Sequence, residues 1–294
     1  MSKEKHTQPV GLVAGIYFGL AEETYHSDPA LSHSGMTDLL VSYPDYWESS
    51  CYNPKREQYS PTDAMVFGKR CHMFLLEEDR FHNHFAHYGM RADPRQHVFL
   101  SKNEYDKIKG SVEKIRSVRE AALHFQNGYP EVTIVWKHGS GIMLRCRIDY
   151  LHTFGAIDYK RIKGVDNYTI GRAIRDQGLD IQCALYTQGI SEARRMLRTG
   201  KGVVLGEHDP AWLEAFKKDK DLMFRFLFQR STPPYIWKFV SLDPDVMDEG
   251  NRAIQSAIDV FKANFSIYGS AEPPAGKADV EEITQFHVPR RFYD

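Results

Sequence analysis

Residues 141–162 read GIMLRCRIDYLHTFGAIDYKRI. Two runs rich in apolar residues, 142–151 and 156–162, flank the short segment 152–155, which contains a glycine. Apolar and charged residues alternate within both runs, and this period of two is typical of β-strands. The stretch therefore predicts two strands joined as a hairpin, and the rest of the fold is organised around them.

Charged residues recur at fixed positions within this hairpin. Because side chains alternate between the two faces of a strand, Asp158 and Lys160 share one face of the second strand. If residues 152–155 form a four-residue loop, Leu151 pairs with Ala156. The same register places Asp149 opposite Asp158. It also brings two cations together, Arg147 and Lys160.

Two carboxylates in directly opposed positions repel each other, because their Cβ atoms are only about 4.5–5.5 Å apart. A divalent cation removes that repulsion, and Mg²⁺ prefers carboxylate oxygens and retained waters. Lys160 can then orient or deprotonate an attacking water and offset charge on a phosphate. Asp149, Asp158, Lys160 and a metal ion thus outline a site that hydrolyses phosphodiester bonds. The Asp-x-Lys pattern alone is common by chance, and the upstream aspartate gives it weight.

Elements outside the hairpin complete an α/β pattern. Glu131–Lys137 predicts another strand, and Ser101-Lys-Asn-Glu104 is a capping box before a long amphipathic helix. Helical patterns also follow Ser32 or Ser34, Thr62 and Thr169. Further strands and helices are predicted at these ranges: strands 222–229 and 235–242, and helix 244–264. We expect a flexible leader at 1–15, a single domain at 16–270 and a C-terminal tail at 271–294.

Five short motifs in the same order resemble the PD-(D/E)XK nuclease superfamily, RecB-like branch. They are Leu31-Ser-His-Ser34, Gly68-x-x-x-His72, Arg147-x-Asp149, Asp158-x-Lys160 and Gln182-x-x-x-Tyr186. The arrangement is most similar to the C-terminal nuclease domain of exonuclease VIII (RecE) and its prophage relatives. The resemblance spans roughly residues 16–188 and implies a restriction-endonuclease-like core, with a central mixed β-sheet flanked by helices. The stretch 192–221 is longer than this family leads us to expect and is interpreted as an insertion.

Residue by residue, the resemblance implies a divalent metal held by His72, Asp149 and Asp158, with the backbone carbonyl of Tyr159 as a further ligand. Lys160 serves the attacking water. Gln182 and Tyr186 lie one helical turn apart, so they share a helix face that lines the site. Glu131 opens the preceding strand and is expected to support the metal ligands from behind. The expected cofactor is Mg²⁺, for which Mn²⁺ can substitute.

The resemblance also implies the substrate and the partners. We expect an exonuclease that resects one strand of linear double-stranded DNA for phage-type recombination. It would act as a ring-shaped tetramer beside a single-strand annealing protein. The chain has no P-loop of its own, so ATP is not expected to drive it. Two alternatives stay open: an endonuclease or repair nuclease of the same fold, and a DNA-end-binding protein without turnover.

Composition limits how such a protein meets DNA. The 294 residues are 42% hydrophobic and 26% charged, and the formal net charge is −1. Because the chain as a whole is not basic, DNA binding must depend on a local patch. Candidate contacts are Arg145, Arg147, Arg161 and Lys163. The four cysteines form no CxxC pair, and no export signal or membrane-spanning run is apparent, so a cytoplasmic protein of a bacterial or phage-infected cell is expected.

Overall fold

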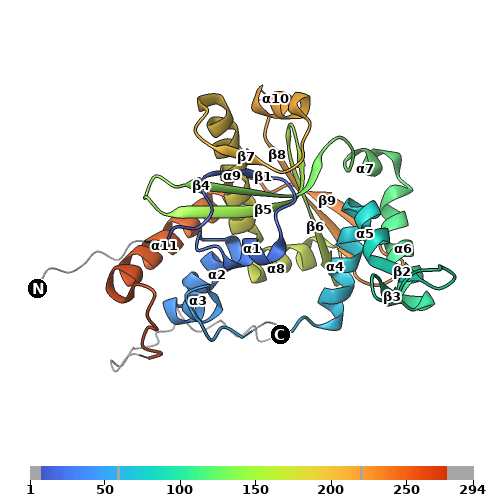
Figure 1. Ribbon diagram of the computed structural model, residues 1–294, viewed down its shortest axis with the longest axis horizontal. Coiled ribbons are helices and arrows are strands. Elements are labelled where there is room, and N and C mark those ends of the chain that lie inside the picture. The colour runs from blue at the N-terminus through green and yellow to red at the C-terminus, as the bar shows by residue number, and fades with distance from the viewer. Residues whose placement is uncertain (1–7, 58–59, 219–220, 277–294) are drawn as a thin grey trace, which may run out of the picture.

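A mixed sheet of seven strands runs through the centre of the computed structural model, which describes residues 8–57, 60–218 and 221–276 (Figure 1). Its strand order is β7-β1-β4-β5-β6-β8-β9. In chain order the strands are β1 (Gly15–Tyr17), β4 (Tyr129–Lys137), β5 (Met143–His152), β6 (Gly155–Ile162), β7 (Val203–Leu205), β8 (Met223–Arg230) and β9 (Trp237–Val240). A small parallel pair, β2 (Phe85–His87) and β3 (Val98–Leu100), lies apart from it.

The sheet is mixed because two of its neighbouring pairs are parallel, β7 with β1 and β6 with β8. The other neighbours are antiparallel. The predicted α/β fold with a central mixed sheet flanked by helices is confirmed.

The β5–β6 hairpin has the predicted register but a tighter turn. Leu151 pairs with Ala156, as expected, and His152 pairs with Gly155, so only two residues form the turn. The paired register then ends at Tyr150↔Ile157. The predicted pairs Asp149–Asp158 and Arg147–Lys160 are therefore wrong, because the two strands separate just before the aspartates would face each other.

Helices cover both faces of the sheet. They are α1 (Glu22–Ser27), α2 (His33–Val41), α3 (Tyr43–Ser49), α4 (Asp63–Leu76), α5 (Glu78–His84), α6 (Lys102–Arg116), α7 (Arg119–Leu123), α8 (Asn167–Asp176), α9 (Leu179–Thr199), α10 (Pro210–Lys218) and α11 (Pro244–Tyr268). The side chains of Ser32, Thr62 and Ser101 cap α2, α4 and α6, as predicted. Among the described residues, no helix is both long and apolar enough to cross a membrane.

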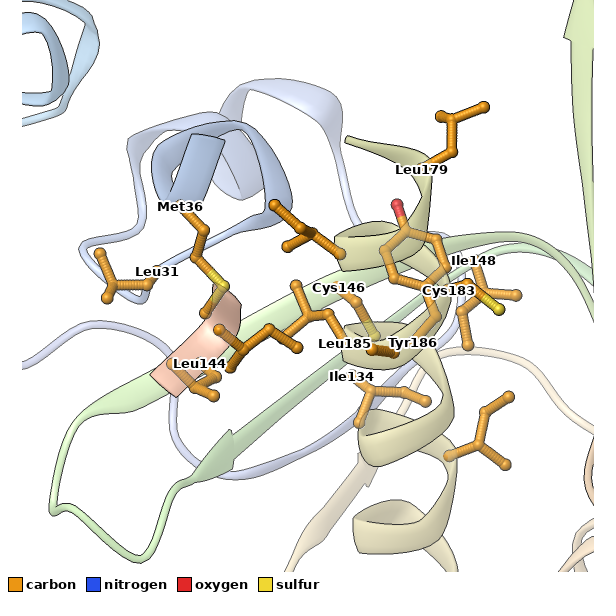
Figure 2. Close-up of a cluster of buried hydrophobic side chains, with 14 of the residues drawn as sticks. Leu31, Met36, Ile134, Leu144, Cys146, Ile148, Leu179, Cys183, Leu185 and Tyr186 are labelled. Atoms are coloured by element: carbon orange, nitrogen blue, oxygen red, sulfur yellow. The ribbon is translucent and has the colours of Figure 1, made fainter. Parts of the chain in front are cut away.

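Two buried clusters fix these helices to the sheet. On one face α9 packs across β4 and β5, and Leu185 meets Ile134 and Cys146 there (Figure 2). On the other face α4 and α6 bury Phe74 and Ile108 against β6 and β8. Full burial of each such side chain contributes about 1.5–3 kcal/mol. The site residues are thus mounted on elements held rigidly from both sides.

Two regions show where the structure differs from, or adds to, the expectations from the sequence. The long amphipathic helix predicted after the capping box at Ser101 is broken into α6 and α7 at residues 117–118. The predicted insertion contains the end of α9, then β7 and α10, while residues 219–220 lie outside the described residues. The division into leader, domain and tail stays a prediction, since residues 1–7 and 277–294 also lie outside them.

Candidate metal and catalytic site

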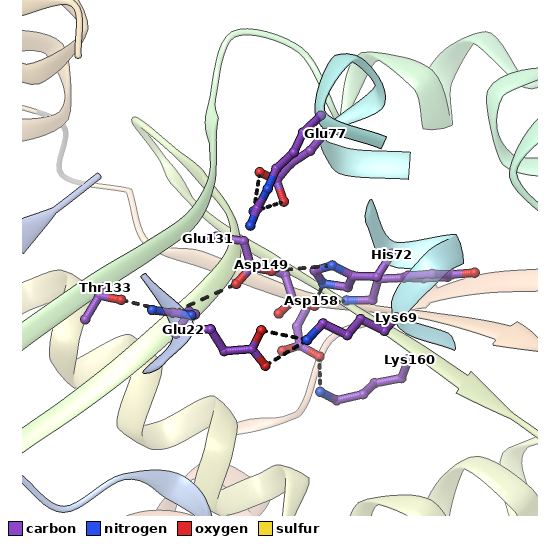
Figure 3. Close-up of polar contacts among 12 residues, drawn as sticks. Glu22, Lys69, His72, Glu77, Glu131, Thr133, Asp149, Asp158 and Lys160 are labelled. Carbon is purple, nitrogen blue, oxygen red and sulfur yellow. Dashed lines mark hydrogen bonds and ion pairs between the residues drawn. The ribbon is translucent and has the colours of Figure 1, made fainter. Parts of the chain in front are cut away.

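Three potential metal ligands meet where α4, β4 and β5 come together. His72, Glu131 and Asp149 each offer one ligand atom, and these atoms all lie within 4.8 Å of one another. His72 Nε2 is 2.9 Å from Asp149 Oδ2, and His72 Nδ1 is 3.4 Å from Glu131 Oε1 (Figure 3). An imidazole with two carboxylates suits a hard or borderline divalent cation such as Mg²⁺ or Mn²⁺. The donor set therefore fits the metal that the sequence predicts.

Local backbone geometry brings the two carboxylates together. The β4–β5 register pairs Pro130 with Tyr150 and Val132 with Ile148, so Glu131 and Asp149 fall at matching positions between these pairs. Glu131 has a φ of +52°, a left-handed conformation that non-glycine residues rarely adopt. Such outliers persist where the surrounding structure imposes them, which is common at functional sites. Glu131, expected only as a supporting residue, thus lies within the cluster itself.

The charges of the cluster shift its pKa values. Burial raises the pKa of Glu131 to about 7. Burial opposes charge on His72 and Asp149 as well, but their mutual attraction outweighs it. It raises the pKa of His72 to about 9 and holds the pKa of Asp149 below its usual value. Without a metal, His72 is therefore a protonated cation between two acidic groups. A divalent cation would take over that role and displace the proton.

Asp158, Lys160 and Gln182 form a second polar group beside the cluster. Lys160 Nζ is 2.7 Å from Asp158 Oδ1, and Gln182 Nε2 donates to Asp158 Oδ2 at 2.5 Å. Asp158 is only 1% exposed, and burial together with the charge of Asp149 raises its pKa to about 6. Both of its oxygens thus face groups of the protein. Asp158 thus positions Lys160 and Gln182 and is not one of the three clustered ligands, and its predicted role as a ligand stays a prediction.

Backbone and aromatic groups link these two sets of residues. The N–H of Tyr159 donates to Asp149 Oδ2 at 2.8 Å, so β6 fixes the orientation of a carboxylate on β5. A role for the Tyr159 carbonyl as a ligand stays a prediction. Tyr186 lies one turn after Gln182 on α9, is buried, and lines the same cleft as the cluster.

A cleft of about 1580 Å³ opens over the cluster of candidate metal ligands. His72, Glu131, Asp149 and Lys160 line it, so both the candidate ligands and the lysine are reachable from solvent. An ion pair between Lys69 Nζ and Glu22 Oε2, 2.6 Å long, connects α4 to α1 beside the cluster (Figure 3). No motif pointed to this pair, because its two residues are far apart in sequence and each is an ordinary surface residue alone.

The four cations predicted to contact DNA occupy different environments. Arg145 is 7% exposed, donates to the carbonyl of Ala30 at 2.7 Å, and pairs with the buried carboxylate of Asp28. The expectation that Arg145 contacts DNA is therefore wrong, because its guanidinium is used inside the protein. Arg147 and Arg161 line the cleft, and Lys163 is exposed.

Comparison with known proteins agrees with the class that this fold and site define. The fold and the site are those of a PDDEXK-like domain, in which an α/β sheet carries acidic residues and a lysine on adjacent strands. The model of a family described as a PDDEXK-like domain of unknown function (DUF3799) matches residues 45–203, more than half of the chain. The chain belongs to this family. The resemblance to the PD-(D/E)XK superfamily is thereby confirmed, while the closer likeness to exonuclease VIII stays a prediction.

A solved structure shares the whole fold. A protein of Eubacterium rectale, described as a "putative exonuclease", matches over 91% of this chain and 97% of its own, with a TM-score of 0.57 and 14% sequence identity. At that identity the match shows a common fold only. None of the curated proteins matches the chain.

Proposed function

We propose that the protein is a divalent-metal-dependent nuclease that hydrolyses phosphodiester bonds of DNA. The observation that carries this proposal is the cluster of His72, Glu131 and Asp149 beside Lys160 in one open cleft. A bound Mg²⁺ or Mn²⁺ supplies Lewis acidity and neutralises charge on a phosphate. Membership of the PDDEXK-like family supports the same reading.

The residues around the metal position have separable tasks. Glu131 and Asp149 hold the cation, and His72 completes the donor set once it loses its proton. Burial favours neutral Lys160, but the charges of Asp158 and Asp149 outweigh it and raise the pKa of its ammonium above the usual value. Lys160 therefore stays charged near neutral pH. It acts by orienting water and stabilising negative charge on the phosphate rather than as a base.

The finer proposal is an exonuclease that degrades one strand of linear duplex DNA with Mg²⁺ and without ATP. Its support is the order of the five motifs and the absence of a P-loop from the sequence. Internal cutting by the same site is the alternative, since one metal centre can serve both modes.

A cleavage assay separates these possibilities. End-labelled linear duplex and supercoiled plasmid are incubated with the purified protein, with EDTA, Mg²⁺ or Mn²⁺. We expect release of labelled mononucleotides or short products from the linear duplex, and an intact plasmid. Asp149→Asn should abolish cleavage, whereas Asp248→Asn, an exposed aspartate on α11, should leave it unchanged. Nicking of the plasmid would favour an endonuclease, and cleavage that survives in EDTA and in Asp149→Asn would refute the metal site.

A further inference from the structure

The cations that line the cleft differ in whether an acid neutralises them. Four have a carboxylate within 4.0 Å: Lys69 with Glu22, Arg80 with Glu77, Arg147 with Glu131 and Lys160 with Asp158. Arg161 and Lys107 also line the cleft, and neither has such a partner among residues 8–57, 60–218 and 221–276. These two side chains therefore carry the unneutralised positive charge of the cleft wall.

Arg161 is held in place by neutral groups. Its Nη1 donates to Ser111 Oγ at 2.6 Å, and its Nη2 donates to the carbonyl of Ser231 at 2.7 Å. Its guanidinium also lies 4.8 Å from the ring centre of Phe67. These contacts fix the guanidinium without neutralising it. A half-buried cation without a counter-ion is costly for stability, so a preformed arginine of this kind indicates an anionic ligand.

Arg161 is connected to the cluster of candidate metal ligands through Tyr159. It follows Lys160 directly on β6, and its Nη1 is 3.4 Å from the hydroxyl of Tyr159. The ring of Tyr159 in turn lies 6.3 Å from the ring of His72, centre to centre. Aromatic packing thus connects the candidate metal ligand to Arg161 along one wall of the cleft.

Lys107 extends this wall. It lies one helical turn before Ser111 on α6, so the two residues share a face of that helix. Ser111 is the residue that Arg161 contacts most closely. The two cations without a carboxylate partner, Arg161 on β6 and Lys107 on α6, therefore lead away from the cluster of candidate metal ligands.

We propose that Arg161 and Lys107 form a phosphate-binding track for the DNA strand, next to the phosphate that is cleaved. This inference rests on the proposed nuclease function and adds where the strand runs. Arg161 provides a fixed, hydrogen-bonding contact to one backbone phosphate. Lys107, an exposed cation, contributes mainly charge to a phosphate farther along. Neither contact reads sequence, so the track binds DNA without sequence preference.

Binding and its salt dependence test the track. The full-length protein is titrated into a fluorescent DNA duplex with a single-stranded overhang, in Ca²⁺ and at several salt concentrations. We expect Arg161→Met to weaken binding about tenfold and Lys107→Met several-fold. Each lost phosphate contact should reduce the slope of log affinity against log salt by about 0.7–0.9. Arg161→Lys should restore the slope. Arg252→Met and Lys262→Met, exposed cations on α11, should change neither quantity.

Cleavage assays distinguish this inference from the proposed function. With Mg²⁺, the track variants should raise KM more than they lower kcat, because their phosphates are not the reacting one. If the wild-type protein cuts DNA but both variants keep its affinity and salt slope, the track is refuted and the proposed nuclease function is not. A wild-type protein that neither binds nor cuts DNA would refute both proposals. If Arg161→Met does not fold, Lys107→Met decides, since Lys107 is exposed and forms no ion pair among the described residues.

Discussion

Glu131 and Asp149 lie opposite each other on β4 and β5, and His72 of α4 spans the two carboxylates with its two ring nitrogens. The acidic pair of this protein thus comes from the β4–β5 pairing. The β5–β6 hairpin contributes differently: its backbone N–H at Tyr159 fixes Asp149, and its Asp158 holds Lys160. The carboxylates of the three-ligand cluster and the carboxylate that pairs with Lys160 are therefore different residues.

Replacing Glu131 should measure its share in metal binding. Glu131→Gln keeps the shape of the side chain but removes a charged ligand, so we expect at least tenfold weaker binding of Mn²⁺ and a matching loss of cleavage. Isothermal titration calorimetry gives the affinity directly. Glu249→Gln, on the exposed side of α11, is the matched control. An unchanged affinity would return Glu131 to the supporting role expected from its sequence position.

The pH dependence of stability should reveal the protons held by the metal-free cluster. The pKa of Glu131 rises from 4.5 to about 7 on folding, and that of His72 rises from 6.5 to about 9. The folded protein therefore binds more protons than the unfolded chain. The resulting stabilisation is complete below the unfolded pKa values and is lost as pH rises through the folded ones. Urea unfolding in EDTA should show stability falling between about pH 5 and pH 9. The double variant Glu131→Gln, His72→Asn should show a smaller fall.

Mg²⁺ should counteract this loss of stability at high pH, because metal and protons compete for the same atoms. We expect the increase in Tm caused by Mg²⁺ to grow as pH rises from about 6 to about 9, measured by differential scanning fluorimetry. An increase in Tm that is independent of pH would mean that the metal binds elsewhere.

Local signals in the sequence were enough for much of the secondary structure. Ser32, Thr62 and Ser101 cap their helices through bonds to residues three positions away, and such contacts depend only on nearby sequence. By contrast, β7 was missed because it has three residues and is stabilised by pairing with β1, far away along the chain.

The site was harder to predict, because its geometry depends on tertiary structure. The residue types His72, Asp149 and Lys160 could be found from motif spacing. That Glu131 faces Asp149 depends on the β4–β5 register and on a left-handed residue in a strand, and neither is encoded in alternation. Alternation also placed Arg145 with the other charged residues, but its buried partner Asp28 could be found only from the structure.

Gly250 should be essential to the contact between α9 and α11. A Cβ at this position would lie 2.4 Å from the backbone carbonyl oxygen of Asp180, which cannot move without displacing α9. Gly250→Ala should therefore destabilise the protein by about 1–3 kcal/mol, as overpacked cores do. Gly171→Ala is the matched control, because it lies in α8 with nothing within 4 Å of its Cβ. It should stabilise by about 0.5–1 kcal/mol, and urea unfolding measures both changes.

The ion pair between Asp158 and Lys160 should be stabilising only as a pair. Lys160→Met leaves Asp158, which is 1% exposed, with only the neutral amide of Gln182. Removing one partner of a buried pair costs about 3–5 kcal/mol, and adding Asp158→Asn should recover much of that loss.

Protonation of Asp158 limits the cost of Lys160→Met at low pH. Its pKa of about 6, set by burial and by Asp149, should rise further once Lys160 is gone. Because the folded pKa then exceeds the unfolded value by more, the destabilisation should increase as pH rises. Lys69→Met, which breaks the exposed pair with Glu22, should cost about 1 kcal/mol or less. Urea unfolding at several pH values measures all three variants. Equal destabilisation by Lys160→Met and by the double variant would show that the two side chains do not act as a pair.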